Sequence, residues 1–148
     1  MILVDTNVVS EGLRPAPSRQ VLLWLNANFE DCAISSITVL ELEVAVQMLP
    51  SGRRRERLQS AVALAIDRFR PRILPFDDNA ARAAAGLFGL AKSKGLSIQQ
   101  LPLKLADLQL AAIAVANDCA LATRDASDLR GLGIDLIDPW SYAASSSG

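Results

Sequence analysis

The sequence predicts an α/β fold: one domain with a central, mostly parallel sheet of about five strands, flanked by helices. Short apolar runs separated by longer helical stretches are the main evidence, because strands that alternate with helices favour a parallel sheet covered on both faces. The length of 148 residues suits one domain with a sizeable core. The expected strands are Met1–Val4, Cys32–Ser35, Arg72–Pro75, Ala120–Thr123 and Ile134–Ile137.

The expected helices carry apolar residues at helical spacing or end at turn signals. In the first of them, Val21, Trp24 and Leu25 fall on one side. Gly52 and Gly95 mark helix ends. The small, polar tail 143–148 is expected to be flexible, which leaves 1–142 as the folded domain. The expected helices are Ser18–Asn28, Ile37–Leu49, Arg54–Arg70, Ala80–Lys94 and Leu105–Asn117.

Composition excludes several classes of function. The chain has no histidine, which excludes Ser-His-Asp and Cys-His triads and zinc sites built on histidine. It is 51% hydrophobic and carries a net charge of −1, which suits a globular protein and leaves nucleic-acid binding open. Cys32 and Cys119 lie in separate apolar stretches, so a cytoplasmic location is expected. Neither a signal peptide nor a membrane span is expected.

Two acids lie just past the ends of expected strands. Asp5 comes after the first strand, and Asp125 occupies the same kind of position after the fourth. In open α/β sheets, ligands bind just outside the carboxyl ends of the strands. Both acids are therefore candidates for a functional site, although Asp125 could instead cap a short helix at 127–130.

Helical phase indicates two further acids. With an advance of about 100° per residue, Glu41 falls in the apolar stripe of Ile37–Leu49, whereas Glu43 falls on the polar side. Asp107 shares its helix face with Leu110 and small alanines, so it is expected to point toward the sheet. A buried carboxylate is costly unless it is paired or bound to metal. The alternatives are a salt bridge to an arginine for Glu41 and a local cap for Asp107.

The four acids together predict a metal site. Carboxylates brought close to one another repel, and the repulsion raises their pKa values. Hard cations such as Mg²⁺ or Mn²⁺ relieve this repulsion because they prefer oxygen ligands. Such a site can activate water and stabilise negative charge on phosphoryl oxygens.

Five segments resemble, in order and spacing, the PIN domain family, and within it the VapC-type toxins of bacterial toxin–antitoxin pairs, close to the FitB-like branch. They are spread over nearly the whole length of the chain and contain all four acids. The segments are Ile2–Glu11, Ile34–Leu42, Leu105–Ala114, Ala122–Asp125 and Ile137–Trp140.

The resemblance implies an Mg²⁺- or Mn²⁺-dependent endoribonuclease that cleaves single-stranded RNA with metal-activated water. Its acidic quartet would be Asp5, Glu41, Asp107 and Asp125, with Asp5 and Asp107 as metal ligands; one or two metal ions are compatible with these residues. Many relatives carry Asn in place of Asp125 and rely on an acid near Asp128, so either acid is a candidate for the fourth position. The resemblance also implies a homodimer and an antitoxin that plugs the active site.

The same resemblance assigns supporting positions. Thr6, Asn7 and Thr123 match polar residues that accompany the quartet in the family. Arg124 and Lys104 lie near the acids in sequence and are candidates for phosphate contacts.

Two alternatives remain at this point. A metal-dependent phosphatase with an aspartyl nucleophile wants Asp-x-Asp after the first strand, whereas this chain has Asn7 in place of the second acid. A non-catalytic PIN-like module that binds RNA or a protein would not need all four acids.

Overall fold

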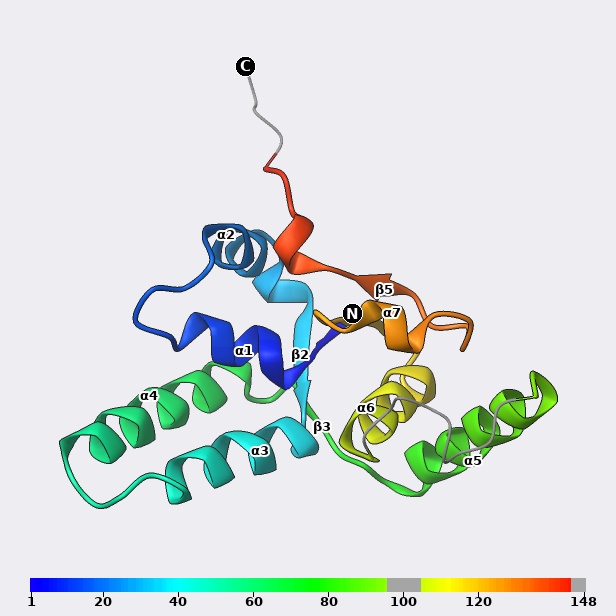
Figure 1. Ribbon diagram of the computed structural model, residues 1–148, viewed down its shortest axis with the longest axis horizontal. Coiled ribbons are helices and arrows are strands. Elements are labelled where there is room, and N and C mark those ends of the chain that lie inside the picture. The colour runs from blue at the N-terminus through cyan, green and yellow to red at the C-terminus, as the bar shows by residue number, and fades with distance from the viewer. Residues whose placement is uncertain (96–104, 145–148) are drawn as a thin grey trace.

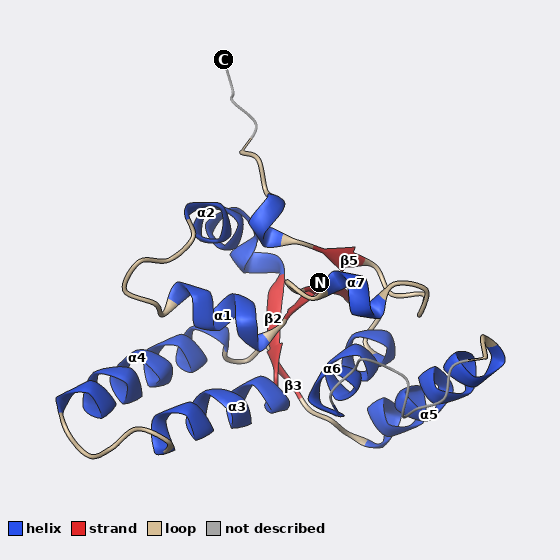
Figure 2. Ribbon diagram, viewed as in Figure 1, coloured by secondary structure: helices blue, strands red, loops and turns tan. Residues whose placement is uncertain are grey.

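A five-stranded sheet forms the centre of the protein in the computed structural model, which describes residues 1–95 and 105–144 (Figure 1; Figure 2). The strand order is β3-β2-β1-β4-β5, and every neighbouring pair is parallel. The predicted α/β class and parallel sheet are therefore confirmed. The strands are β1 (Ile2–Val4), β2 (Cys32–Ser35), β3 (Ile73–Leu74), β4 (Ala120–Ala122) and β5 (Leu136–Ile137).

Apart from Ser35 at the end of β2, the strands are apolar, because both faces of the sheet are covered. Leu3 packs into one hydrophobic cluster and Val4 into another. Leu121 and Ala122 divide in the same way. Successive side chains of a strand point to opposite faces, so each short strand contributes to two core layers at once.

Helices form a layer on each face. Figure 1 shows α1 to α4 on one side of the sheet and α5, α6 and α7 on the other. After β5, a 3₁₀ turn covers Pro139–Ser141, and residues 143–144 are exposed. The rest of the expected tail, 145–148, lies outside the described residues. No helix of the described ranges is both long enough and apolar enough to cross a bilayer. The helices are α1 (Thr6–Gly12), α2 (Arg19–Asn28), α3 (Ser36–Gln47), α4 (Arg53–Phe69), α5 (Asp78–Ser93), α6 (Leu105–Ala116) and α7 (Ala126–Leu129).

The prediction that Glu41 lies in a buried apolar stripe is wrong. The buried face of α3 consists of Thr38, Leu42 and Val46, and Glu41 is exposed. The expected stripe instead faces solvent, where Met48 is 76% exposed. Apolar residues occur almost all round α3, so their spacing alone does not identify the buried side.

The order of the strands creates a switch point between β1 and β4. From β1 the chain continues to β2 and β3 on one side, and it then returns to place β4 on the other. The backbone N–H of Asp5 donates to the carbonyl of Ala122 at 2.9 Å, so the carboxyl ends of β1 and β4 lie side by side. Ligands of open α/β folds bind at this kind of position.

Candidate active site

Asp5 is fixed where β1 passes directly into α1. Its backbone is extended, and its carbonyl accepts from Val8 and Val9 in the first turn of α1. Its carboxylate is buried and accepts a 2.7 Å hydrogen bond from Thr123 Oγ1. The hydrogen bond and the burial place this carboxylate at the end of the sheet, facing Thr123.

Burial raises the pKa of Asp5 above its ordinary value of 3.8. Hydrogen bonds from Thr123 and from the backbone N–H of Thr6 act in the opposite direction, and the negative charges of Asp107 and Glu41 raise the pKa further. Burial and the neighbouring charges together outweigh these hydrogen bonds, so the ionised form of Asp5 is less favoured here than in water.

Thr123 joins the ends of β4 and β1. Its side chain is almost fully buried; the hydroxyl donates to Asp5 and accepts from the backbone N–H of Asp125 at 3.1 Å. The carboxylate of Asp125 also accepts from Asn7 Nδ2 at 3.3 Å. Asp125 makes no side-chain cap for α7, so its alternative role as a helix cap is not realised.

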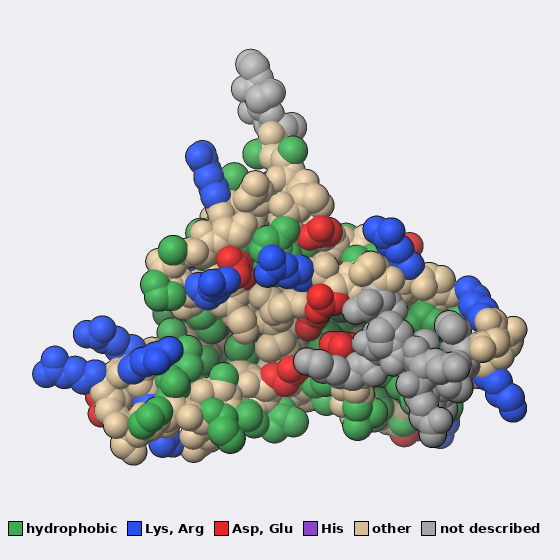
Figure 3. Space-filling model, in the orientation of Figure 1, with side chains coloured by type: hydrophobic (Ala, Val, Ile, Leu, Met, Phe, Trp, Pro, Cys, Tyr) green, Lys and Arg blue, Asp and Glu red, His purple; other side chains and the backbone are tan. Residues whose placement is uncertain are grey.

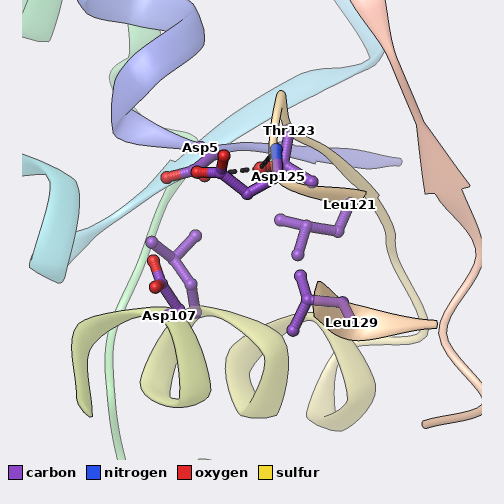
Figure 4. Close-up of a pocket in the computed structure, with 7 residues that line it drawn as sticks. Asp5, Asp107, Leu121, Thr123, Asp125 and Leu129 are labelled. Carbon is purple, nitrogen blue, oxygen red and sulfur yellow. Dashed lines mark hydrogen bonds between the residues drawn. The ribbon is translucent and has the colours of Figure 1, made fainter. Parts of the chain in front are cut away.

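Asp107 approaches the same place from α6. It lies in the first turn, half-buried, and Figure 4 shows it reaching from the helix toward the strand ends that carry Asp5 and Asp125. The three carboxylates line one cavity of about 10 Å³, large enough for about one water molecule. Its walls also contain Thr123, Leu110, Leu121 and Leu129.

Glu41 joins the site through Thr6. Thr6 Oγ1 lies 3.0 Å from Glu41 Oε1, and Thr6 follows Asp5 directly in the chain. Although Glu41 is exposed, its charge acts on Asp5. The structure thus brings Asp5, Asp107 and Asp125 into one cavity and attaches Glu41 to its edge.

Of the two predicted phosphate contacts, the structure places Arg124. Arg124 is exposed and lies over the ring of Trp140, 5.0 Å from its centroid. Lys104 and the side chain of Asp128 lie outside the part of the chain that the structure describes. Figure 3 shows acidic side chains gathered in the middle of the face in view, with basic side chains nearby.

The oxygen donors fit a hydrated magnesium ion. Within residues 1–95 and 105–144, no three acids or thiols are close enough together to hold a metal as a set. Mg²⁺ commonly binds one or two carboxylates and keeps several waters. Asp5 and Asp107 can provide the two carboxylates. Asn7 Oδ1 is buried and has no hydrogen-bond partner among the described residues; a water held by a cation could donate to it.

Sequence reasoning missed Ser35 and Thr38, which are fully buried beside the site. Ser35 ends β2 and caps α3 by accepting from the Thr38 backbone N–H. A serine at the junction between a strand and a helix indicates a helix cap, so the role of Ser35 as a cap could be predicted. It does not reveal the contact between Thr38 and Thr6, which are 32 residues apart.

Comparison with known proteins identifies the family. The family model described as "PIN domain" matches residues 2–132. The VapC ribonuclease Y4jK of Sinorhizobium fredii is 40% identical, covering 97% of this chain and 100% of the relative. The toxin FitB of Neisseria gonorrhoeae is 37% identical, with 95% and 99% covered. The crystal structure of FitAcB from the same species superposes with a TM-score of 0.85 at 35% identity, covering 96% of this chain and all of that one. The parallel sheet with acids at its switch point agrees with this match. The family model and these relatives therefore show that the chain belongs to the PIN domain family.

Proposed function

We propose that this protein is an Mg²⁺-dependent endoribonuclease that cleaves single-stranded RNA and acts as the toxin of a toxin–antitoxin pair. The observation that carries the proposal is the convergence of Asp5, Asp107 and Asp125, from three distant segments, on one cavity. The names of two relatives, a VapC ribonuclease and the toxin FitB, support the same activity.

Asp5 and Asp107 are the residues that would hold the metal. When bound, Mg²⁺ supplies a water of lowered pKa and neutralises charge on the phosphoryl oxygens. Thr123 donates to Oδ2 of Asp5, and a carboxylate has about four lone-pair sites, so Asp5 can still bind a cation. Leu110, together with the other leucines of the cavity wall, keeps bulk water away, which strengthens electrostatic interactions inside.

The remaining carboxylates are suited to proton transfer. Thr6 orients Glu41, and Asn7 orients Asp125. As water attacks phosphorus, a P–O bond forms and the bond to the leaving ribose oxygen breaks; the water proton passes to one of these carboxylates, and the leaving oxygen takes a proton from solvent. Arg124, exposed beside the site, is placed to contact a neighbouring phosphate.

The proposal is tested with single-stranded RNA of mixed sequence. Cleavage is expected in Mg²⁺, with none in EDTA and recovery on addition of Mn²⁺, because the acidic site needs a hard cation. A double-stranded RNA of the same sequence serves as the control. RNA retained on a filter without cleavage in either metal would favour the binding module, and release of phosphate from an aryl phosphate would favour the phosphatase.

We further propose that the antitoxin places an arginine or a lysine at the acidic cavity, and that the guanidinium of an arginine suits it best. Arginine can bind two carboxylate oxygens at once, and Asp5 and Asp107 offer such oxygens. Because the guanidinium and Mg²⁺ need the same oxygens, inhibition should weaken as Mg²⁺ rises. Cleavage at a fixed toxin-to-antitoxin ratio is followed across an Mg²⁺ series at constant ionic strength. Constant inhibition would place the antitoxin away from these acids.

A homodimer is the proposed assembly. Leu40 and Val44 lie one turn apart on α3, and Met48 follows one turn later at its C-terminal end; they are 58%, 44% and 76% exposed. Figure 3 shows hydrophobic side chains along the lower edge of the molecule, where α3 lies in Figure 1. An exposed apolar row of this kind favours an interface. A monomeric sedimentation coefficient at all concentrations would contradict the dimer.

A further inference from the structure

Four side chains form a continuous run of hydrogen bonds that ends on Glu41. The hydroxyls of Ser35 and Thr38 lie 3.3 Å apart. Those of Thr38 and Thr6 lie 2.9 Å apart, and Thr6 Oγ1 is 3.0 Å from Glu41 Oε1. The run therefore crosses from the end of β2, through the first turn of α3, to the start of α1 and back to α3. We refer to these four residues as the hydroxyl relay.

The number of protons fixes the direction of the relay. Each hydroxyl can donate once, and an ionised carboxylate can only accept. Thr6 must use its proton on Glu41, so the contact between Thr6 and Thr38 requires Thr38 as the donor. Thr38 then accepts from Ser35, whose oxygen already accepts from the Thr38 backbone N–H at 3.0 Å. Each hydroxyl of the relay thus donates to the next group, in the order Ser35, Thr38, Thr6 and finally Glu41.

Burial makes this direction difficult to reverse. Ser35 and Thr38 are both 0% exposed, so their hydroxyls are shielded from solvent and depend on one another. A buried polar group without a partner is costly, and hydrogen bonds in a chain strengthen one another. If the Thr6 hydroxyl turned from Glu41 toward Thr38, the protons of the two threonine hydroxyls would face each other.

We propose that Thr38 is a positioning residue of the nuclease site, acting through Thr6 to hold Glu41 in place. The inference rests on the proposed function, since it gives Glu41 a place in the reaction. An exposed glutamate otherwise samples many rotamers. The relay offsets this freedom by directing one committed donor at Oε1, and the donor residue is covalently next to Asp5.

The Thr38→Val variant tests the relay because valine keeps the shape and removes the donor. We expect kcat to fall about tenfold with KM unchanged, since substrate binding does not involve this buried residue. Thr38→Ser restores the hydroxyl and should return most of kcat. Ser36→Ala is the matched control: it removes a hydroxyl from the same helix start, where Ser36 Oγ accepts from the Phe76 backbone outside the relay.

A double-mutant cycle with Glu41→Gln separates positioning from a general loss of fold. If Thr38 acts through Glu41, adding Thr38→Val to Glu41→Gln should lower kcat by less than about twofold. An equal tenfold loss in both backgrounds would overturn the relay. If Thr38→Val does not fold, Thr6→Val breaks the last link from a more exposed position and enters the same cycle.

The same cycle is read by denaturation in EDTA, which needs no catalysis. The losses of stability caused by Thr38→Val and Glu41→Gln should not add, because the two residues share one network. Coupling in denaturation without RNA cleavage by the wild type would overturn the proposed function and support the relay. Wild-type cleavage combined with additive losses in both measurements would overturn the relay and leave the nuclease in place.

Discussion

Replacing Asp107 by asparagine is expected to lower RNA cleavage by about a hundredfold or more while the fold stays intact. Asparagine keeps the size of the side chain and removes the charge that would hold the metal. The position of α6 does not depend on that charge, because buried residues such as Leu110 and Ile113 anchor the helix. Cleavage of single-stranded RNA in Mg²⁺ measures the loss, and cleavage at the wild-type level would remove Asp107 from the mechanism.

The same variant should keep or gain stability in EDTA. Burial raises the pKa of Asp5, and the charge of Asp107 contributes to the rise. Asp5 therefore binds a proton more readily in the folded protein than in the unfolded chain. Its contribution to the free energy of unfolding is full below pH 3.8 and is lost as pH rises through its folded-state pKa. Asp107→Asn removes one like charge, so this loss should be smaller. Melting curves across pH in EDTA measure it, and an unchanged or larger loss would contradict the proposed repulsion.

The strands could be predicted because their signal is local. Each is a short apolar run, and all but β3, which is followed by Pro75, end at a polar residue. Burial on both faces leaves no polar alternation in these runs. The sequence also places Asp5 and Asp125 after two of these runs. Once the order of the strands is known, the two acids must share one edge of the sheet.

Helix α1 and the orientation of α3 could not be predicted in this way. In α1, the β-branched Val8 and Val9 favour a strand more than a helix; both are buried, so packing against the core overrides propensity. In α3, apolar residues surround the helix. The side that faces the core is decided by the neighbouring elements, and no sequence period records it.

Two buried acids show why a site needs tertiary information. Glu11 and Asp5 are both buried. A hydrogen bond from the Ser18 backbone lowers the pKa of Glu11, with a further contribution from Arg14. The pKa of Asp5, in contrast, is raised, first by burial and then by the charges of two nearby carboxylates. Both residues carry a carboxyl group and both have little exposed surface, but Glu11 has a cationic partner whereas Asp5 lies among other carboxylates. The difference that indicates function therefore lies in the surroundings of each group.

Glu41→Gln is expected to lower kcat by about a hundredfold, in the range found when a group that transfers a proton is removed. Glutamine can still accept from Thr6, so the position of the side chain is preserved. What is lost is the negative charge, together with the ability to take a proton from the attacking water. The effect should therefore appear in kcat more than in KM.

Glu43→Gln is the matched control, because Glu43 lies two residues away on the same helix and is also exposed. The substitution removes the same charge from the same element. It should leave kcat within about twofold and stability within about 0.5 kcal/mol, as for ordinary surface positions. Both variants are compared in single-turnover cleavage of the same RNA at saturating Mg²⁺. A similar loss in both would mean that the net charge of α3 matters to RNA binding, and that the contact with Thr6 does not distinguish Glu41. A loss confined to Glu41→Gln requires a specific place for that carboxylate, which the hydrogen bond from the residue next to Asp5 provides.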